Sequence, residues 1–358
     1  TLKPSFDKNI FVYYDTVAYA TSSLAIGATA NHPGAVVAAA DTDSKTLDVG
    51  NNSFAINVTA EDNSFTATYT VNVYRKSNDA TLSALTVSVG TLNPSFTPAT
   101  TDYNVTVNDE TTEIEIGATA THANATVSGD GIKQLSYGTN RFDIIVTAED
   151  ESYSQTYTVN LYRNCPPDMR DQNGNSYGVE LIGCNCWTTS NLKSTHYYDG
   201  TPVPFAEGYY AEIYPDTAGN ITTFGRLYDW ASASRGEAPD ADGYIQGVCP
   251  EGWALPTLAD FECLLALGSE AIRHDSTAFW LNDHTATNSS GFGAVPAGYY
   301  ENSTASFIHL LGEGYIWIGE PASMQTAKAC TFLFGCPETT IVSIPTRNGV
   351  SVRCIKTE

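Results

Sequence analysis

The chain has 358 residues, with 40 acidic and 17 basic side chains and a formal net charge of −23 at pH 7. A chain of this length predicts two or three domains, because a single domain usually holds about 100–200 residues. The negative charge repels phosphates and anionic lipid headgroups, so it argues against nucleic acid as a partner. Acidic residues are spread over the whole chain, which is typical of a soluble surface.

An internal repeat fills the first part of the chain. TLKPSF at 1–6 returns as TLNPSF at 91–96, IGATA at 26–30 returns at 116–120, and TYTVNVYR at 68–75 returns as TYTVNLYR at 156–163. The repeated unit is therefore about 88–90 residues long. This length is too great for a solenoid repeat and indicates a tandem domain.

Alternating apolar and polar residues predict half-buried β-strands in each repeat. Tyr103, Val105 and Val107, for example, alternate with polar neighbours, and turn-forming residues such as SGDG at 128–131 separate the segments. We expect all-β sandwiches of two antiparallel sheets over residues 1–76 and 77–163.

The two copies differ by one predicted strand. The second copy has the alternating segment LSALTVSVG at 82–90, and the first copy has no counterpart. An unpaired sheet edge favours the addition of another strand. That strand is expected to lie upstream in the precursor, or to come from another chain, as in a pilus or surface-polymer subunit.

The segments LSALTVSVGTLNPSF, TDYNVTV, LSYGTNRFDIIVTAED and TYTVNLYR together resemble the bacterial cadherin-like β-sandwich repeat family. The resemblance covers 82–163 completely and 1–76 without one strand. It implies immunoglobulin-like sandwiches that serve as a stalk or in adhesion on a bacterial surface, and it implies no particular ligand pocket.

The composition changes at residue 164, where we place the start of a third domain, 164–358. All eight cysteines lie between Cys165 and Cys354, and all five tryptophans lie in this part of the chain. Such clustering favours disulfides and an oxidising compartment, with a zinc site as the alternative.

Two helices are predicted in this third domain. Thr257 followed by Asp260 has the pattern of a capping box, with Gly268 as the end of the helix. A second short helix is expected over 225–234. The remaining segments predict short strands and long loops.

Five strings occur in order over 171–354: DQNGNSYGVELIGCNCWTTSNLKSTHYYDGTPVP, FGRLYDWASA, CPEGWALPTLADFECLL, SSGFGAVPAGYY and NGVSVRC. They resemble the Fibrobacter succinogenes major paralogous domain, a family similar to C-type-lectin-like and formylglycine-generating-enzyme-like folds. The resemblance implies a C-terminal α+β domain of C-type-lectin-like fold on a secreted bacterial protein.

The same resemblance guides the pairing of cysteines. Cys249 and Cys354 occupy the two positions at which the family commonly has cysteine, so we pair them first and pair Cys330 with Cys336 second. Cys184 and Cys186 are additional to the family pattern and suggest a local staple.

Loop tyrosines are the main signal of binding in the third domain, because aromatic rings stack on sugars and on protein hot spots. Trp187, Trp230, Trp253 and Trp317 lie inside the family strings and are expected in the core. The predicted ligand-binding residues are Tyr198, Tyr209, Tyr210, Tyr214, Tyr299 and Tyr300.

Metal and catalytic signals are weak. Asp240 and Asp242 are spaced to share one calcium ion, and 171–175 has the spacing that begins a calcium loop, although a solvated loop or a tight turn is favoured at both places. The G-x-S-x-G and HExxH motifs are absent. We expect no enzyme activity and no cofactor other than this calcium.

We therefore predict a non-enzymatic extracellular adhesion protein whose β-sandwich stalk presents a C-terminal binding domain. Its expected partner is a host or bacterial surface protein or glycan, and a carbohydrate-binding module is the alternative reading. The expected location is the outer cell surface, with secretion or a lipoprotein anchor, and the membrane is reached only through an N-terminal anchor that is removed from this chain.

Overall fold

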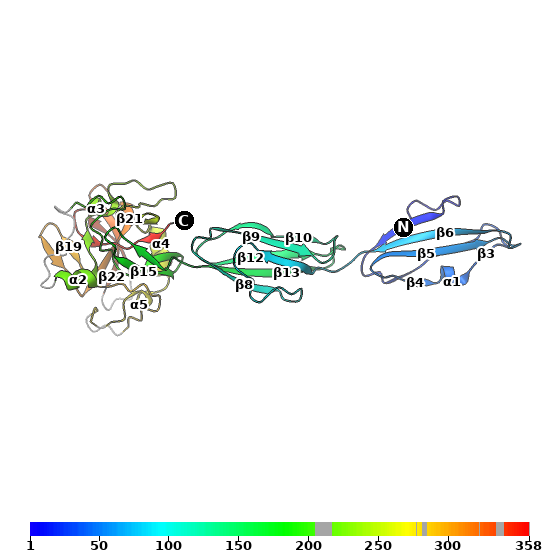
Figure 1. Ribbon diagram of the computed structural model, residues 1–358, viewed down its shortest axis with the longest axis horizontal. Coiled ribbons are helices and arrows are strands. Elements are labelled where there is room, and N and C mark those ends of the chain that lie inside the picture. Colours follow the sequence, from blue (N-terminus) through cyan, green and yellow to red (C-terminus); the bar gives the residue numbers. More distant parts are fainter. Residues whose placement is uncertain (205–216, 277, 281–284, 322, 334–339, 358) are drawn as a thin grey trace. The chain divides into compact units, whose positions relative to one another are not determined.

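The computed structural model describes residues 1–204, 217–276, 278–280, 285–321, 323–333 and 340–357 (Figure 1). The chain forms two compact units. One unit comprises residues 1–105, 113–134 and 141–161, and the other comprises 106–112, 135–140 and 162–358.

The first repeat is a small sandwich built on a long hairpin. Its elements are β1 (Val12–Val17), β2 (Ser23–Ala25), β3 (Val36–Val37), α1 (Ala39–Thr42), β4 (Ser44–Thr46), β5 (Gly50–Thr59) and β6 (Thr66–Arg75). One sheet has the order β1-β6-β5-β3, with β1 parallel to β6, and the other pairs β2 with β4. Its core contains Leu47, Ile56, Val71 and Val73.

The second repeat has the same plan with one further strand. Its elements are β7 (Leu82–Val87), β8 (Asp102–Val107), β9 (Glu113–Ala120), β10 (Thr126–Ser128), β11 (Gly131–Gln134), β12 (Gly138–Thr147) and β13 (Ser154–Arg163). The sheets have the orders β10-β12-β13-β8 and β11-β9-β7. Tyr103, Val105 and Val107 are buried and alternate with exposed residues along β8. The predicted β-sandwich fold of the N-terminal part is confirmed.

The C-terminal domain contains two five-stranded sheets. The first has the order β14 (Asp168–Arg170), β15 (Ser176–Ile182), β16 (Asn185–Thr188), β25 (Ile355–Lys356) and β18 (Trp253–Ala254). The second has the order β17 (Leu227–Tyr228), β24 (Val350–Ser351), β21 (Glu313–Pro321), β22 (Thr326–Leu333) and β23 (Thr340–Pro345). A separate hairpin pairs β19 (Tyr299–Glu301) with β20 (Ser306–Ile308).

The helices of this domain are α2 (Thr217–Phe224), α3 (Trp230–Ser234), α4 (Leu258–Leu265) and α5 (Ser269–Ile272). The predicted capping box is confirmed at α4, where Thr257 and Asp260 each accept a hydrogen bond from the other's backbone N–H. The helix predicted over 225–234 is shorter, because Leu227 and Tyr228 pair with β24 instead. In the described part of the chain, no helix is long and apolar enough to cross a membrane.

The tryptophans form much of the core. Trp187, Trp253 and Trp317 are buried as predicted, and Trp280 is buried too. Trp230 is only partly buried and packs edge-on against Trp317, with ring centroids 5.6 Å apart. The C-type-lectin-like fold expected for this domain stays a prediction.

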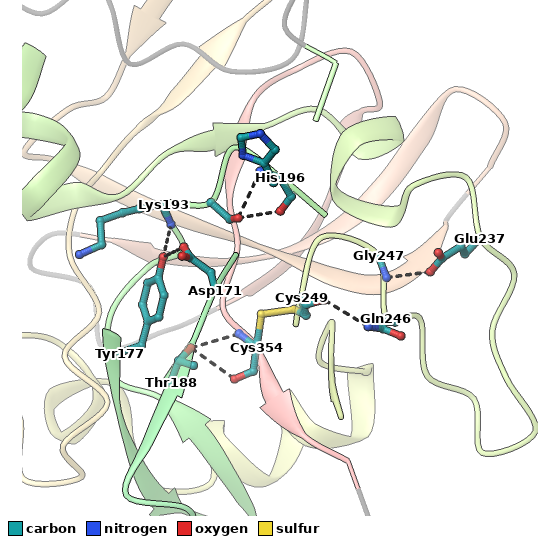
Figure 2. Close-up of a disulfide and its surroundings, with 11 residues drawn as sticks. Asp171, Tyr177, Thr188, Lys193, His196, Glu237, Gln246, Gly247, Cys249 and Cys354 are labelled. Atoms are coloured by element: carbon teal, nitrogen blue, oxygen red, sulfur yellow. Dashed lines mark hydrogen bonds between the residues drawn. A yellow bond between two sulfur atoms is a disulfide. The ribbon is translucent and has the colours of Figure 1, made fainter. Parts of the chain in front are cut away.

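Three disulfides join described cysteines of the C-terminal domain. Cys249 is joined to Cys354, the pair that the family resemblance implies, with Cα atoms 5.9 Å apart (Figure 2). The Thr188 hydroxyl accepts a hydrogen bond from the Cys354 N–H at 3.1 Å beside this bond. The disulfide closes a sequence separation of 105 residues, so it constrains the unfolded chain strongly.

One prediction about cysteines is wrong: Cys184 and Cys186 form no local staple, because they are joined to different partners, Cys263 and Cys165. Among the described cysteines Cys330 is free, and its predicted partner Cys336 lies outside the described residues. Cys330 lies on β22 within a hydrophobic cluster, and burial there raises the pKa of its thiol.

A buried guanidinium ties several loops of this domain together. Arg353 donates to the Asn191 side-chain oxygen at 2.9 Å and to the carbonyls of Thr188 at 3.0 Å and Gly293 at 2.8 Å. It also donates to the Phe292 carbonyl, and its guanidinium carbon lies 4.3 Å from the centroid of the Phe292 ring. Complete burial lowers the pKa of Arg353 to about 9.

Candidate functional site

The structure describes three of the six predicted binding tyrosines, Tyr198, Tyr299 and Tyr300. Tyr209, Tyr210 and Tyr214 lie outside the described residues. Tyr198 is half-buried in the loop after His196. The assignment of Tyr300 to a binding surface is corrected, because its side chain is only 7% exposed and its ring packs against Phe307 at 5.3 Å.

Tyr299 is half-buried, but its ring is surrounded by other side chains. It packs edge-on against Tyr315 at 5.0 Å and against His309 at 5.8 Å. The Tyr315 hydroxyl donates to Glu313, which also pairs with His309. Burial raises the pKa of Tyr299. The ring therefore has little free face for stacking on a ligand.

Tyr198 belongs to a group that we call the Tyr198 cluster: Tyr197, Tyr198, Asp199, Thr201 and Arg235. The Arg235 guanidinium carbon lies 4.7 Å from the ring centroid of Tyr197 and 5.2 Å from that of Tyr198. Its Nη2 atom lies 2.6 Å from the Asp199 carboxylate. A planar cation next to two aromatic rings is thus fixed at a partly exposed position.

Local backbone structure positions this cluster. Arg235 is the C-cap of α3 and has the left-handed φ of 57°, which turns the chain away at the helix end. On the other side, the Asp199 carboxylate accepts hydrogen bonds from the Thr201 N–H at 3.0 Å and the Thr201 hydroxyl at 2.7 Å. The cluster is therefore built from a helix end and a closed turn.

Hydrogen bonds stabilise the charged form of the Asp199 carboxyl. The hydroxyl and the N–H of Thr201, followed by Arg235, lower the pKa of Asp199 to about 2. This value lies below the usual pKa of an aspartate carboxyl in an unfolded chain, about 3.9. The ionised carboxylate therefore contributes stability above about pH 4, and this contribution is lost as the pH falls through about 2.

A titration can separate the causes of this pKa. Replacement of Thr201 by valine removes the hydroxyl and is expected to raise the Asp199 pKa towards 4, more than Arg235→Gln does. Carboxyl-carbon NMR titration of Asp199 measures both shifts. Arg170→Gln, at an exposed ion pair with Asp168, is the control and should leave Asp199 unchanged. A pKa that stays near 2 in Thr201→Val would contradict this account.

The segment next to the cluster rests on a turn at Asp171. Its carboxylate accepts hydrogen bonds from the N–H groups of Asn173 and Asn175, each at 2.9 Å, and from the Tyr177 hydroxyl at 2.6 Å. Figure 2 shows Tyr177 between Asp171 and the backbone of Lys193, whose N–H donates to the Tyr177 oxygen at 2.8 Å. Burial, followed by the Asp171 hydrogen bond, raises the pKa of Tyr177. The favoured tight turn over 171–175 is confirmed.

The side chain of His196 is hydrogen-bonded to the 171–175 turn. The His196 Nδ1 atom lies 3.1 Å from the Asn173 amide nitrogen and 3.0 Å from the Thr195 hydroxyl. The Gln172 amide donates to the Tyr198 carbonyl at 2.6 Å. These contacts fix the backbone that carries Tyr198. The side chains of Asn173 and His196 therefore stabilise the loop.

The second position suggested for calcium, Asp240 and Asp242, lies in a turn that is closed by backbone hydrogen bonds. Asp240 accepts hydrogen bonds from the N–H groups of Asp242 at 3.0 Å and Tyr244 at 2.8 Å. Within the described residues, no group of three or more His, Cys, Asp and Glu side chains could hold a metal ion. Calcium at Asp240 and Asp242 stays a prediction.

Sequence reasoning missed Arg235, which is central to the cluster. The residue lies two positions after the string FGRLYDWASA and belongs to no motif, and only folding brings it next to Tyr197 and Tyr198. The signal that could have found it is the paired Tyr197-Tyr198 before an Asp-Gly-Thr turn, because exposed tyrosines often stack with arginine.

Comparison with known families divides the chain at the same places. Residues 1–76 and 82–164 match the model of the cadherin-like beta sandwich domain. Residues 181–356 match the model of the Fibrobacter succinogenes major domain. Residues 1–164 therefore belong to the cadherin-like β-sandwich family, and residues 181–356 belong to the Fibrobacter succinogenes major domain family. The cadherin-like domains suggest an extracellular protein of the adhesion type.

Similar solved structures include domains of cadherins and of titin. The extracellular domain of protocadherin gammaB4 is 10% identical, with a TM-score of 0.27, over 48% of this chain and 34% of that chain. Drosophila N-cadherin EC1-4 is 7% identical, with a TM-score of 0.23, over 44% and 49%. Titin domains I67–I69 are 12% identical, with a TM-score of 0.23, over 56% and 81%.

These likenesses are distant. The chain spans about a third to a half of the two cadherin chains, and TM-scores this low carry no argument about function. A search of curated proteins found no match.

Proposed function

We propose that this chain is a non-enzymatic adhesion protein of the outer cell surface, whose C-terminal domain has a C-type-lectin-like fold and binds a surface ligand. The cadherin-like family of residues 1–164 supports the adhesion role. The three disulfides support an oxidising, extracellular location. The expected partner is a protein on a host cell or on a neighbouring bacterium.

The observation that carries the proposal is the stacking of Arg235 with Tyr197 and Tyr198. Tyrosine and arginine are enriched among the residues that dominate protein interfaces. Here the arginine is already held by Asp199 at 2.6 Å, so little rotamer freedom is lost when a partner binds. The chemistry fits a protein ligand with an acidic or aromatic contact better than a hydrogen-bonded sugar.

Ligand screening with the intact chain tests the proposal. We expect a hit on an array of extracellular-matrix and bacterial surface proteins. When Tyr198 becomes alanine, Kd should rise about thirtyfold, a loss of about 2 kcal/mol of binding free energy. Tyr153→Ala is the matched control, since Tyr153 is a tyrosine 52% exposed in the second repeat. Equal losses of affinity in Tyr198→Ala and Tyr153→Ala would show that the Tyr198 cluster is not part of the binding site.

A glycan array run in parallel separates the carbohydrate alternative. Binding to glycans alone, weakened by Tyr198→Ala, would replace the protein ligand by a sugar that stacks on the ring. Assays with and without calcium test the suggested ion. Loss of binding in Asp240→Asn, together with loss on chelation, would place calcium at that turn.

A further inference from the structure

One face of the first repeat carries no charged side chain. The sheet β1-β6-β5-β3 buries one face in the core and presents the other to solvent, and all of its residues are described. On the solvent side lie every second residue of 12–16, 51–59 and 66–74, together with Val36. We call these side chains the neutral face. They are valine, alanine, tyrosine, serine, threonine and asparagine.

The corresponding face of the second repeat is charged. Its solvent side carries Asp102 on β8 and Arg141 and Asp143 on β12, and the last two form an ion pair at 3.2 Å. At the three equivalent positions the neutral face has Val12, Ser53 and Ala55. The two repeats have the same plan of strands in this sheet, so the fold does not require the absence of charge.

The first repeat is also nearly neutral as a whole. Residues 1–76 contain seven acidic and five basic side chains, whereas residues 77–163 contain eleven and three. Two chains with a net charge of −23 each repel one another. A contact between two copies is therefore least unfavourable at the first repeat.

Polar side chains of the neutral face are hydrogen-bonded to one another across β5 and β6. The Thr68 hydroxyl donates to the Asn57 side-chain oxygen at 2.8 Å, and the hydroxyls of Thr59 and Thr66 lie 3.0 Å apart. A partner that covers groups already paired in this way leaves few donors or acceptors unsatisfied. Burial of this polar surface is therefore tolerated.

Three large apolar side chains are exposed on the neutral face. Val12 is 42% exposed, Tyr14 is 57% exposed and Val36 is 62% exposed. The equivalent residues of the second repeat are polar or charged, namely Asp102, Asn104 and Thr126. Tyrosine is enriched and charged residues are depleted at the centre of protein interfaces. The composition of the neutral face is thus that of a protein interface.

Two opposite charges border the neutral face. Lys3 exchanges two backbone hydrogen bonds of 2.8 Å with Tyr14, so it lies at the β1 edge. At the β3 edge the Asp41 carboxylate accepts a hydrogen bond from the Asn57 N–H at 2.8 Å. A two-fold axis parallel to the strands sets the β1 edge of one copy along the β3 edge of the other. The borders of the face are therefore complementary in charge to a second copy.

We propose that the neutral face packs against the neutral face of a second copy of this chain, as two aligned sheets about 10 Å apart. With β5 and β6 each ten residues long, the two copies together bury roughly 1,000 Å². This area is near the lower limit of specific interfaces, so the expected Kd is on the order of 10 μM. The contact lies in the first repeat and goes beyond the adhesion role of the C-terminal domain.

Sedimentation equilibrium of the 358-residue chain tests this contact. We expect monomers and dimers in equilibrium between about 1 and 300 μM. Ala55→Asp places a carboxylate where the second repeat already has one, so the fold is kept, which circular dichroism checks. Like charges in the facing sheets should raise the Kd at least about tenfold. Thr156→Asp adds a carboxylate to the equivalent face of the second repeat, and this matched control should dimerise normally.

A charge exchange tests whether the two faces meet. Ala55 lies on β5, one of the two middle strands, so both copies of this residue are near the axis. Ala55→Lys alone should dimerise as weakly as Ala55→Asp, because like charges again face each other. A mixture of the two variants should form dimers at least as tight as those of the unaltered chain, which sedimentation of the mixture measures.

Three results would overturn the proposal. Monomers alone at about 300 μM would mean that the chain does not pair in this way. Normal dimers of Ala55→Asp, or no gain on mixing the two variants, would place the contact on another surface. Monomers whose Thr68 and Thr70 amide signals shift on addition of a soluble neutral glycan would make a glycan the partner of the neutral face.

Discussion

Replacement of Arg353 by alanine is expected to lower the free energy of unfolding of the C-terminal domain by about 3–5 kcal/mol. The substitution leaves the Asn191 side-chain oxygen and the carbonyls of Thr188 and Gly293 without their buried donor. Each buried acceptor left unsatisfied costs about 1–3 kcal/mol. Lysine cannot reach all of these groups with one ammonium, so Arg353→Lys should also be destabilising.

Denaturant titration followed by tryptophan fluorescence measures this effect. All five tryptophans lie in the C-terminal domain, so the signal reports its unfolding apart from that of the repeats. Arg170→Ala is the control, because Arg170 is exposed and forms a surface ion pair with Asp168. A change below about 1 kcal/mol in Arg353→Ala would show that water replaces the lost donors.

Removal of the Cys249–Cys354 disulfide by a double serine substitution is expected to cost about 2–5 kcal/mol. The bond joins residues 105 apart and thereby constrains a large part of the unfolded domain. It also holds the strand-forming end of the chain next to Thr188, whose hydroxyl contacts Cys354.

The same fluorescence titration, without reductant, measures this loss. Cys330→Ala is the matched control, since it removes a buried sulfur without removing a cross-link and should cost about 1 kcal/mol. If the double substitution costs no more than Cys330→Ala, packing around the two cysteines holds the domain and the cross-link adds little.

Periodicity predicted the sandwiches well, because a strand with one buried face repeats every second residue. The alternation of Tyr103, Val105 and Val107 corresponds directly to the buried face of β8. Strand partners that lie far along the chain were harder to predict from the sequence. IGATA at 116–120 is a strand that pairs with β7, whereas the same five residues at 26–30 belong to no strand.

The cysteines show the same limit. Cys184 and Cys186 are two residues apart, with Cys184 in the turn before β16 and Cys186 within that strand, and tertiary structure sets their partners Cys263 and Cys165. Spacing alone suggested a local staple. Only the family resemblance implied the pair of Cys249 and Cys354.

The candidate site was predicted in part. A tyrosine pair in a polar loop indicated Tyr198, but sequence cannot tell an exposed ring from a packed one, and Tyr300 is packed against Phe307. Arg235 carries no local signal of its role. Its position depends on the end of α3 and on the Asp199 turn, which meet only in the folded domain.

Adhesion of coated beads tests the central proposal most directly. Beads that carry the intact chain are placed under flow on layers of host epithelial cells and on bacterial cells. We predict that they are retained, that soluble chain releases them, and that retention falls in Tyr198→Ala and Arg235→Ala but persists in Tyr153→Ala. Retention no greater than that of uncoated beads on every surface, or equal retention in all variants, would contradict an adhesion role for the Tyr198 cluster.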